Sequence, residues 1–104
     1  MKIVRVTYTT KAEYVEHNQN NIKTVMADLQ AINNSGINYN ACLSPDGRSF
    51  THTAFFNLDE DEKVLLGLPS FIQFQQELKS GGLEAPPKQE VLTLVASSTD
   101  VFKS

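Results

Sequence analysis

A chain of 104 residues has the size of one domain, and 40% hydrophobic against 20% charged residues is a balance typical of globular proteins. Its net charge of −3 argues against a phosphate-binding surface and against a polybasic membrane anchor. The single cysteine excludes an internal disulfide and a cysteine-rich zinc site. We expect one domain over residues 1–104 that binds neither nucleic acid nor a membrane.

The first residues do not have the pattern of an export signal. Arg5 interrupts the first apolar run, and no small-residue cleavage site follows it. No stretch approaches the roughly 20 apolar residues that span a bilayer. Together with the one free thiol, at Cys42, these features predict a cytoplasmic protein.

The first strand and the first helix have clear patterns. Residues 2–9 alternate β-branched and aromatic side chains, which predicts a strand. Thr10 and Glu13 have the spacing of a capping box at a helix start. The helix should end at residues 33–36, with Gly36 in the left-handed conformation. Its apolar stripe is formed by Val15, Ile22, Val25, Met26, Leu29 and Ile32.

Two further strands, residues 37–43 and 49–56, are predicted on either side of the turn Ser44-Pro45-Asp46-Gly47, with a positive φ at Gly47. A three-residue loop is the working register, and a four-residue loop would shift the pairing by one residue and exchange the two faces. The working register pairs Tyr39 with Thr53, Asn40 with His52 and Cys42 with Phe50.

The second half of the chain predicts helices and a last strand. The acidic cluster at residues 59–62 complements the positive end of a helix that starts near residue 59 or 60. Pro69 fits the first turn of a further helix. Residues 89–97 predict a strand with apolar side chains on both faces. The helix after Pro69 has a buried stripe of Phe71, Phe74 and Leu78.

This order of elements predicts a ferredoxin-like βαββαβ fold of the α+β class, with a four-stranded antiparallel sheet and both helices on one face. The bare face of the sheet would then expose an apolar patch, and the commonest partner for such a patch is a second copy of the chain. We expect a homodimer in which the two sheets stack face to face. The residues expected on the bare face are Ile3, Val91, Val95 and either Ile37 or Phe55.

The RNA-recognition fold has the same order of strands and helices, but it needs basic residues and exposed aromatic rings on its central strands. Here Arg5 and Tyr8 fall on opposite faces of the first strand, and the net charge is negative. These features argue against an RNA-binding sheet.

The segment Ala54-Phe55-Phe56-Asn57 and the stretch of residues 68–78 resemble the dimeric α+β barrel superfamily, and most of all the antibiotic-biosynthesis-monooxygenase-type domains. The resemblance covers nearly the whole chain. Phe56 stands where family members often carry tryptophan, and Phe71 stands where they often carry histidine. The resemblance implies a dimeric barrel with a pocket in each subunit between the sheet and the helices.

His52 is the candidate catalytic residue, because histidine titrates near neutrality and can move a proton. In the working register it lies beside Asn40, with Asn38 one pair further along. A histidine with two amides could bind a polar organic ligand, although His52 could equally be bonded to an amide without any task. The predicted ligand-binding residues are Tyr8, Asn38, Asn40 and Phe56.

The other polar residues carry weaker signals. Arg5 could pair with Glu90 of the last strand or hold an anionic ligand, and the ion pair is the better interpretation. His17 is expected on the surface, and Cys42 is expected to be a small core or interface residue. Neither histidine has the carboxylate spacing of a metal site, and we expect no metal.

Two functions remain open. The resemblance implies a monooxygenase or isomerase that uses no cofactor and acts on a small aromatic organic molecule. The alternative is a non-catalytic dimeric module that binds a small ligand or another protein. A pocket of roughly 300 Å³ or more with convergent polar groups would favour the enzyme, and a filled core would favour the module.

We predict that the protein assembles as a dimer. Native mass spectrometry of the purified protein should show the mass of a dimer, because the sheet face left bare by the helices needs a cover. A monomer at all accessible concentrations would contradict the face-to-face barrel.

Overall fold

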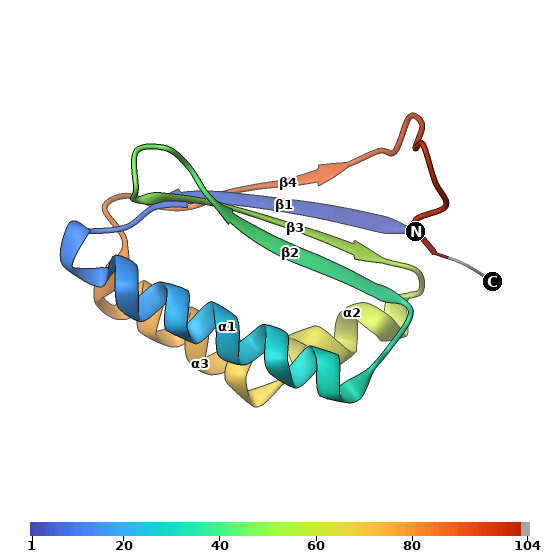
Figure 1. The fold of residues 1–104 in the computed structure, drawn as a ribbon, viewed down its shortest axis with the longest axis horizontal. Helices are drawn as coiled ribbons and strands as arrows, with labels where there is room; N and C mark the ends of the chain where they lie inside the picture. Colours follow the sequence, from blue (N-terminus) through green and yellow to red (C-terminus); the bar gives the residue numbers. More distant parts are fainter. Residues whose placement is uncertain (103–104) are drawn as a thin grey trace.

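The chain forms a four-stranded antiparallel sheet with its helices packed on one face (Figure 1). In this computed structural model, which describes residues 1–102, the strands lie in the order β2-β3-β1-β4. The strands are β1 (Lys2–Thr9), β2 (Ile37–Leu43), β3 (Ser49–Phe56) and β4 (Lys88–Leu92). The helices are α1 (Val15–Ile32), α2 (Asp59–Leu66) and α3 (Pro69–Glu77), with the 3₁₀ turn η1 (Ala12–Tyr14) before α1 and the π-helical turn η2 (Leu78–Gly82) after α3. The predicted ferredoxin-like order of elements is confirmed.

The core lies between the sheet and the helices. Every second residue of β3 is buried, because one face of the strand packs against the helices. The stripe predicted on α3 and its extension is buried as expected. None of the helices within residues 1–102 is long and apolar enough to cross a bilayer. The buried cluster consists of Tyr8, Val25, Phe50, Ala54, Phe56, Leu65, Phe71, Phe74 and Leu78.

The register of the β2–β3 hairpin differs by one residue from the working register, which was therefore wrong. The side chain opposite His52 is Ala41 rather than Asn40. A shift of one residue exchanges the faces of the strand, so that the odd-numbered residues of β2 point toward the helices. The observed pairs are Tyr39 with Ala54, Asn40 with Thr53, Ala41 with His52 and Cys42 with Thr51.

The Asp46 side chain explains this register. Its carboxylate accepts hydrogen bonds from the backbone N–H groups of Arg48 and Ser49, both at 2.8 Å, and it thereby draws Arg48 into the turn. The backbone N–H of Ser44 then donates to the carbonyl of Ser49 at 2.8 Å and closes a loop of four residues. Gly47 has a φ of 76°, as predicted.

Both ends of α1 differ from the sequence prediction. Thr10 does not cap the helix, because it is fully buried and its backbone N–H donates to the carbonyl of Arg48 at 3.0 Å. The helix begins after η1 without a side-chain cap. At the other end the left-handed residue is Asn33, with a φ of 55°, and not Gly36.

The last strand is shorter than predicted, and it ends at Leu92. Leu92 pairs with Ile3, and β1 begins one residue earlier, so the residues that follow have no strand beside them. Val95 is 97% exposed. The segment after β4 turns back toward the N-terminal end of β1 (Figure 1).

The bare face of the sheet is also less apolar than predicted. Ile3 and Phe55 do lie on it, and Ile3 is buried there. Ile37 and Val91 have the register of the helix-facing side. The remaining residues of the bare face are mostly polar, and they include Arg5, Thr7, Asn38, Asn40, Thr51, Thr53 and Glu90.

Asp61 connects the loop after α1 with the loop after β3, at one end of the sheet. Its carboxylate accepts hydrogen bonds from the side-chain amide of Asn34 at 3.0 Å and from the backbone N–H of Leu58 at 2.9 Å. A Cβ atom at Gly36 would lie 2.3 to 2.6 Å from this carboxylate. Gly36 is therefore required by the close approach of Asp61, and not by its backbone conformation.

Replacing Gly36 by alanine should lower the free energy of unfolding by about 1–3 kcal/mol, because the new methyl group would displace the Asp61 carboxylate from its donors. Urea denaturation measures this loss. Gly81→Ala is the matched control, since a Cβ there meets no atom within 4 Å. Equal stability of the two variants would contradict the role of Asp61.

Candidate functional site

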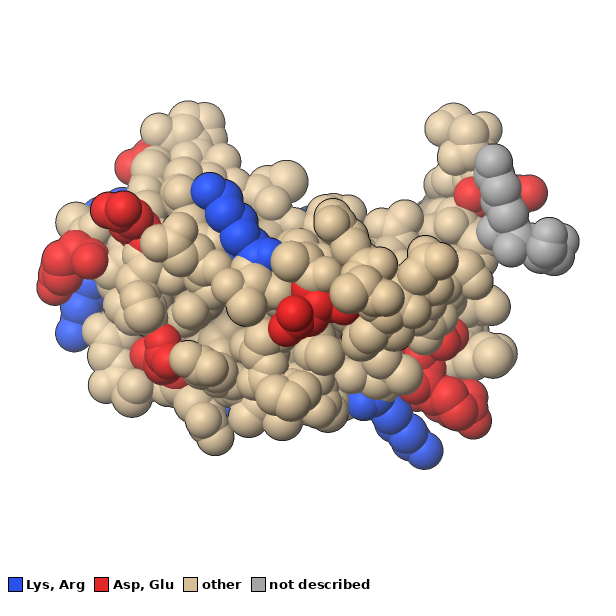
Figure 2. Space-filling view, turned by 60° about the horizontal axis from the view of Figure 1, so that its bottom comes forward, with Lys and Arg blue, Asp and Glu red and all other residues tan. Residues whose placement is uncertain are grey.

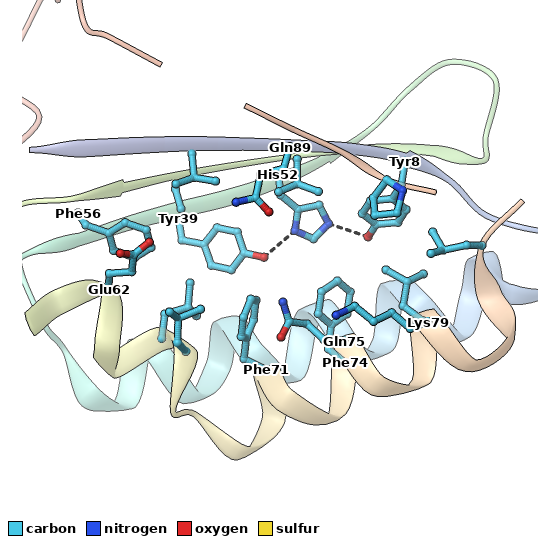
Figure 3. A pocket seen from close by; sticks show the side chains of 18 residues that line it. Tyr8, Tyr39, His52, Phe56, Glu62, Phe71, Phe74, Gln75, Lys79 and Gln89 are labelled. Carbon is cyan, nitrogen blue, oxygen red and sulfur yellow. Dashed lines mark hydrogen bonds between the residues drawn. The ribbon is translucent and has the colours of Figure 1, made fainter. Parts of the chain in front are cut away.

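A cavity of about 300 Å³ lies between the helix-facing side of the sheet and α3 (Figure 3). Strands β1, β2 and β3 and Gln89 of β4 form its sheet side, and α2, α3 and η2 form its helix side. We call it the aromatic pocket, because aromatic rings supply much of its wall. These rings are Tyr8, Tyr39, His52, Phe56, Phe71 and Phe74.

His52 lies on the sheet side of the pocket with a hydrogen bond at each ring nitrogen. The hydroxyl of Tyr8 lies 2.7 Å from Nε2, and the hydroxyl of Tyr39 lies 2.6 Å from Nδ1 (Figure 3). His52 is only 5% exposed. We refer to these three side chains as the Tyr8–His52–Tyr39 network.

The sheet register brings these three residues together. His52 is on β3, opposite Val6 of β1 and Ala41 of β2. Tyr8 and Tyr39 each lie two residues away from those partners, on the same face, so both reach His52 diagonally across the sheet.

A count of hydrogens shows what the network offers a ligand. A neutral imidazole has one N–H and one bare nitrogen. One tyrosine must therefore donate to the bare nitrogen, while the other accepts from the N–H. The accepting tyrosine keeps its own hydroxyl hydrogen, which no bond inside the network uses. In either tautomer, one O–H donor remains free to bind a ligand.

Asn18 of α1 favours one of the two tautomers. Its side-chain N–H donates to the Tyr8 oxygen at 2.9 Å, so that oxygen already accepts one hydrogen bond. The Tyr8 hydroxyl can then donate to His52 Nε2, and His52 donates from Nδ1 to Tyr39. This arrangement leaves the free hydroxyl hydrogen on Tyr39. Asn18 is completely buried.

Burial keeps the network neutral. Desolvation lowers the pKa of His52 to about 4, because the charged imidazolium is disfavoured away from water. Desolvation also raises the pKa of Tyr8 and of Tyr39 well above their ordinary value. At pH 7 the imidazole and both phenols are therefore uncharged.

The structure brings only some of the predicted site residues together. His52, Tyr8 and Phe56 line the aromatic pocket. Asn38 and Asn40 do not reach His52, because the observed register places them on the opposite face of the sheet, where both are exposed. Asn40 instead borders a separate hollow between β2 and α1.

Two members of the site were not predicted from the sequence. For Tyr39, the hairpin register decides which face of the sheet its side chain occupies. Asn18 follows His17 in a polar run of α1. Its signal was its spacing, since residues 15, 18, 22, 25 and 29 follow the three- and four-residue steps of the buried stripe.

Polar side chains mark the rim of the pocket. Gln75 and Lys79 come from the helix side, Gln89 from β4 and Glu62 from α2 (Figure 3). Glu62 is paired with Lys2 at 3.1 Å. Within residues 1–102, no group of three or more histidine, cysteine, aspartate or glutamate side chains could hold a metal ion.

The other polar residues lie away from the pocket. Arg5 pairs with Glu90 at 2.9 Å on the bare face, so the predicted ion pair is confirmed. His17 is on the surface, as predicted, where it pairs with Glu77. Cys42 is exposed on the bare face, and the alternative that it belongs to the core was wrong. On the side shown in Figure 2, lysine and arginine side chains are separated and form no continuous basic surface.

Solved structures with low sequence identity have the same fold. A candidate antibiotic biosynthesis monooxygenase from Nitrosomonas europaea superposes with a TM-score of 0.77 at 13% identity, over 92% of this chain and 100% of its own. A second candidate monooxygenase, from Bacteroides thetaiotaomicron, gives 0.81 at 10% identity, over 95% and 93%. SnoaB, a cofactor-independent oxygenase from Streptomyces nogalater, gives 0.68 at 12% identity, over 95% and 98%.

No protein-family model matches the sequence, and no curated protein matches it. At identities this low, structural similarity establishes the fold. The function has to be inferred from the residues of the site. The chain has the ferredoxin-like α+β fold of the antibiotic-biosynthesis-monooxygenase-type domains, as the resemblance implied.

The buried His52 predicts a loss of stability between pH 7 and pH 5. A histidine with an unfolded pKa near 6.5 and a native pKa of about 4 binds its proton in this range only when the chain unfolds. The free energy of unfolding should therefore fall as the pH falls, by about 2 kcal/mol from this group. Urea denaturation at both pH values measures the change.

The His52→Gln variant removes the titrating group and should lose this part of the pH dependence, whatever its own stability. His17→Gln, which replaces the exposed histidine, should keep it. An unchanged pH dependence in His52→Gln would show that His52 does not stay neutral in the native state.

Proposed function

We propose that this protein is a cofactor-independent monooxygenase of a small aromatic molecule that carries an enol or phenol oxygen. The observation that supports this most directly is the neutral Tyr8–His52–Tyr39 network on the sheet side of an aromatic pocket. It combines a flat apolar binding surface with one hydroxyl donor and one group able to take a proton.

The aromatic walls would orient the substrate. Phe74 of α3 stacks on His52 with ring centroids 5.4 Å apart, and Phe71 meets Tyr39 edge-on with centroids 6.2 Å apart (Figure 3). An aromatic ligand beside these ring pairs would bury apolar surface and make ring contacts. Its oxygen would then lie within reach of the hydroxyl that the network leaves free.

The network would stabilise the ionised substrate and accept the proton that it loses. The free hydroxyl donates to an enolate or phenolate oxygen and stabilises the negative charge as it develops. That negative charge lies near the imidazole and favours its protonated form. A proton lost by the substrate can therefore pass through the Tyr8 hydroxyl to the bare Nε2 of His52, although the pKa of His52 is about 4 in the empty site.

The substrate itself would supply the electrons. When an activated CH₂ group becomes a carbonyl, the reaction is R₂CH₂ + O₂ → R₂C=O + H₂O, so all four electrons that reduce O₂ come from the carbon and no reductant is needed. The protein then contributes orientation, exclusion of water and proton transfer. SnoaB, which has the same fold, is described as a cofactor-independent oxygenase, and this supports the assignment.

The test is oxygen consumption with anthrone and with its 2-carboxylic acid, aromatic ketones whose CH₂ group is acidic enough to enolise. An oxygen electrode measures the rate above that in buffer, and mass spectrometry identifies the quinone product. We expect turnover by the wild type, and a loss of about 100-fold or more in kcat/KM for His52→Gln. His17→Gln serves as the control.

Each other outcome would contradict the proposal in a different way. Enolisation without oxygen uptake would indicate the isomerase. Saturable binding without turnover would indicate the non-catalytic ligand-binding module. Turnover that is equal in the wild type and in His52→Gln would remove His52 from the chemistry.

A further inference from the structure

A lysine lies directly beside the apolar stripe that α3 and η2 present to the pocket. Phe71, Phe74 and Leu78 recur at three- and four-residue steps and are buried. Gln75 and Lys79 each follow one of these residues directly on the same face, and both line the pocket. Lys79 is exposed, and Figure 3 shows its side chain extending from η2 along the pocket.

Lys79 is the uncompensated charge of this site. Among residues 1–102, no carboxylate lies within 4.0 Å of its ammonium group. Glu62, the acidic residue that lines the pocket, is paired with Lys2. The other titratable groups that line it, those of Tyr8, Tyr39 and His52, are neutral at pH 7. The lining therefore has one negative and one positive side chain, and the positive one, Lys79, has no ion-pair partner within residues 1–102.

Two side-chain amides accompany this charge. Gln75 follows Phe74 on α3, and Gln89 projects from β4 toward the pocket (Figure 3). An amide N–H and an ammonium group are both donors that suit a carboxylate oxygen. The methylene stem of Lys79 can lie along the apolar wall while its charged end remains at the rim, where water is displaced only when a ligand binds.

We propose that the aromatic ligand carries a carboxylate, and that Lys79 binds it at the rim while the Tyr8–His52–Tyr39 network binds a ligand oxygen inside. This inference rests on the proposed function only in that the aromatic pocket binds an aromatic molecule. It adds the substrate class, which is an aromatic or aryl-substituted carboxylic acid in its anionic form. Lys79 is then a specificity-determining residue.

The test compares two probes of nearly equal shape, 1-naphthoate and 1-naphthamide. Isothermal titration at low ionic strength gives the ratio of their dissociation constants. Wild-type protein should bind the carboxylate about tenfold more tightly than the amide, the value expected for one charge-assisted hydrogen bond. Added salt should weaken binding of the carboxylate and leave that of the amide unchanged.

Three variants make the assignment specific. Lys79→Met keeps the apolar stem and should bring the ratio to about one, with the amide bound as before. Lys79→Arg should keep the preference, because the charge is retained. Lys63→Met is the matched control, since it removes an exposed lysine of α2 that does not line the pocket, and it should leave the ratio unchanged.

The outcomes separate this inference from the proposed function. If the wild type binds the amide but does not prefer the carboxylate, or if Lys79→Met keeps the preference, the role of Lys79 is wrong and the pocket stands. If neither probe binds, the aromatic pocket is not a ligand site, and both proposals fail together.

Discussion

An imidazole buried in an aromatic core needs a partner at both ring nitrogens. An unpaired nitrogen there would lose its hydrogen bond to water and gain none in the protein, which would destabilise the fold. His52 meets this requirement with two tyrosine hydroxyls from the neighbouring strands, and Asn18 continues the chain of hydrogen bonds into α1. The arrangement couples strands β1, β2 and β3 to a helix through polar contacts inside an otherwise apolar layer. It also fixes the position of the one hydroxyl hydrogen that the network does not use.

The hairpin turn controls this arrangement from outside the site. Asp46 binds two backbone N–H groups in the turn, which sets the loop at four residues and places Tyr39 on the same face as His52. A shift by one residue would point Tyr39 toward the bare face and leave one nitrogen of His52 without its partner. The register is therefore held at both ends of the hairpin, by the carboxylate in the turn and by the imidazole in the core.

The elements that repeat a pattern could be predicted from the sequence, and those that depend on partners could not. Alternation and helical spacing located the strands and helices, and opposite charges on adjacent strands located the pair of Arg5 and Glu90. The hairpin register could not be fixed, because Ser44-Pro45-Asp46-Gly47 suits loops of two lengths. The end of β4 depends on where β1 begins, and the capping role expected of Thr10 failed because its amide is bonded to the hairpin instead.

The separation of charge within the pocket limits what it can bind. Burial keeps His52 and its two tyrosines neutral, so negative charge on a ligand oxygen beside them is stabilised only if a proton remains nearby, on the hydroxyl or on the imidazole. Lys79 lies at the rim, where water can solvate it when the pocket is empty. A permanent charge on the ligand is therefore best matched at the rim, and a charge that forms during reaction is best matched inside. A ligand with a carboxylate at one end and an ionisable oxygen at the other satisfies both conditions, and the orientation in which it binds follows from them.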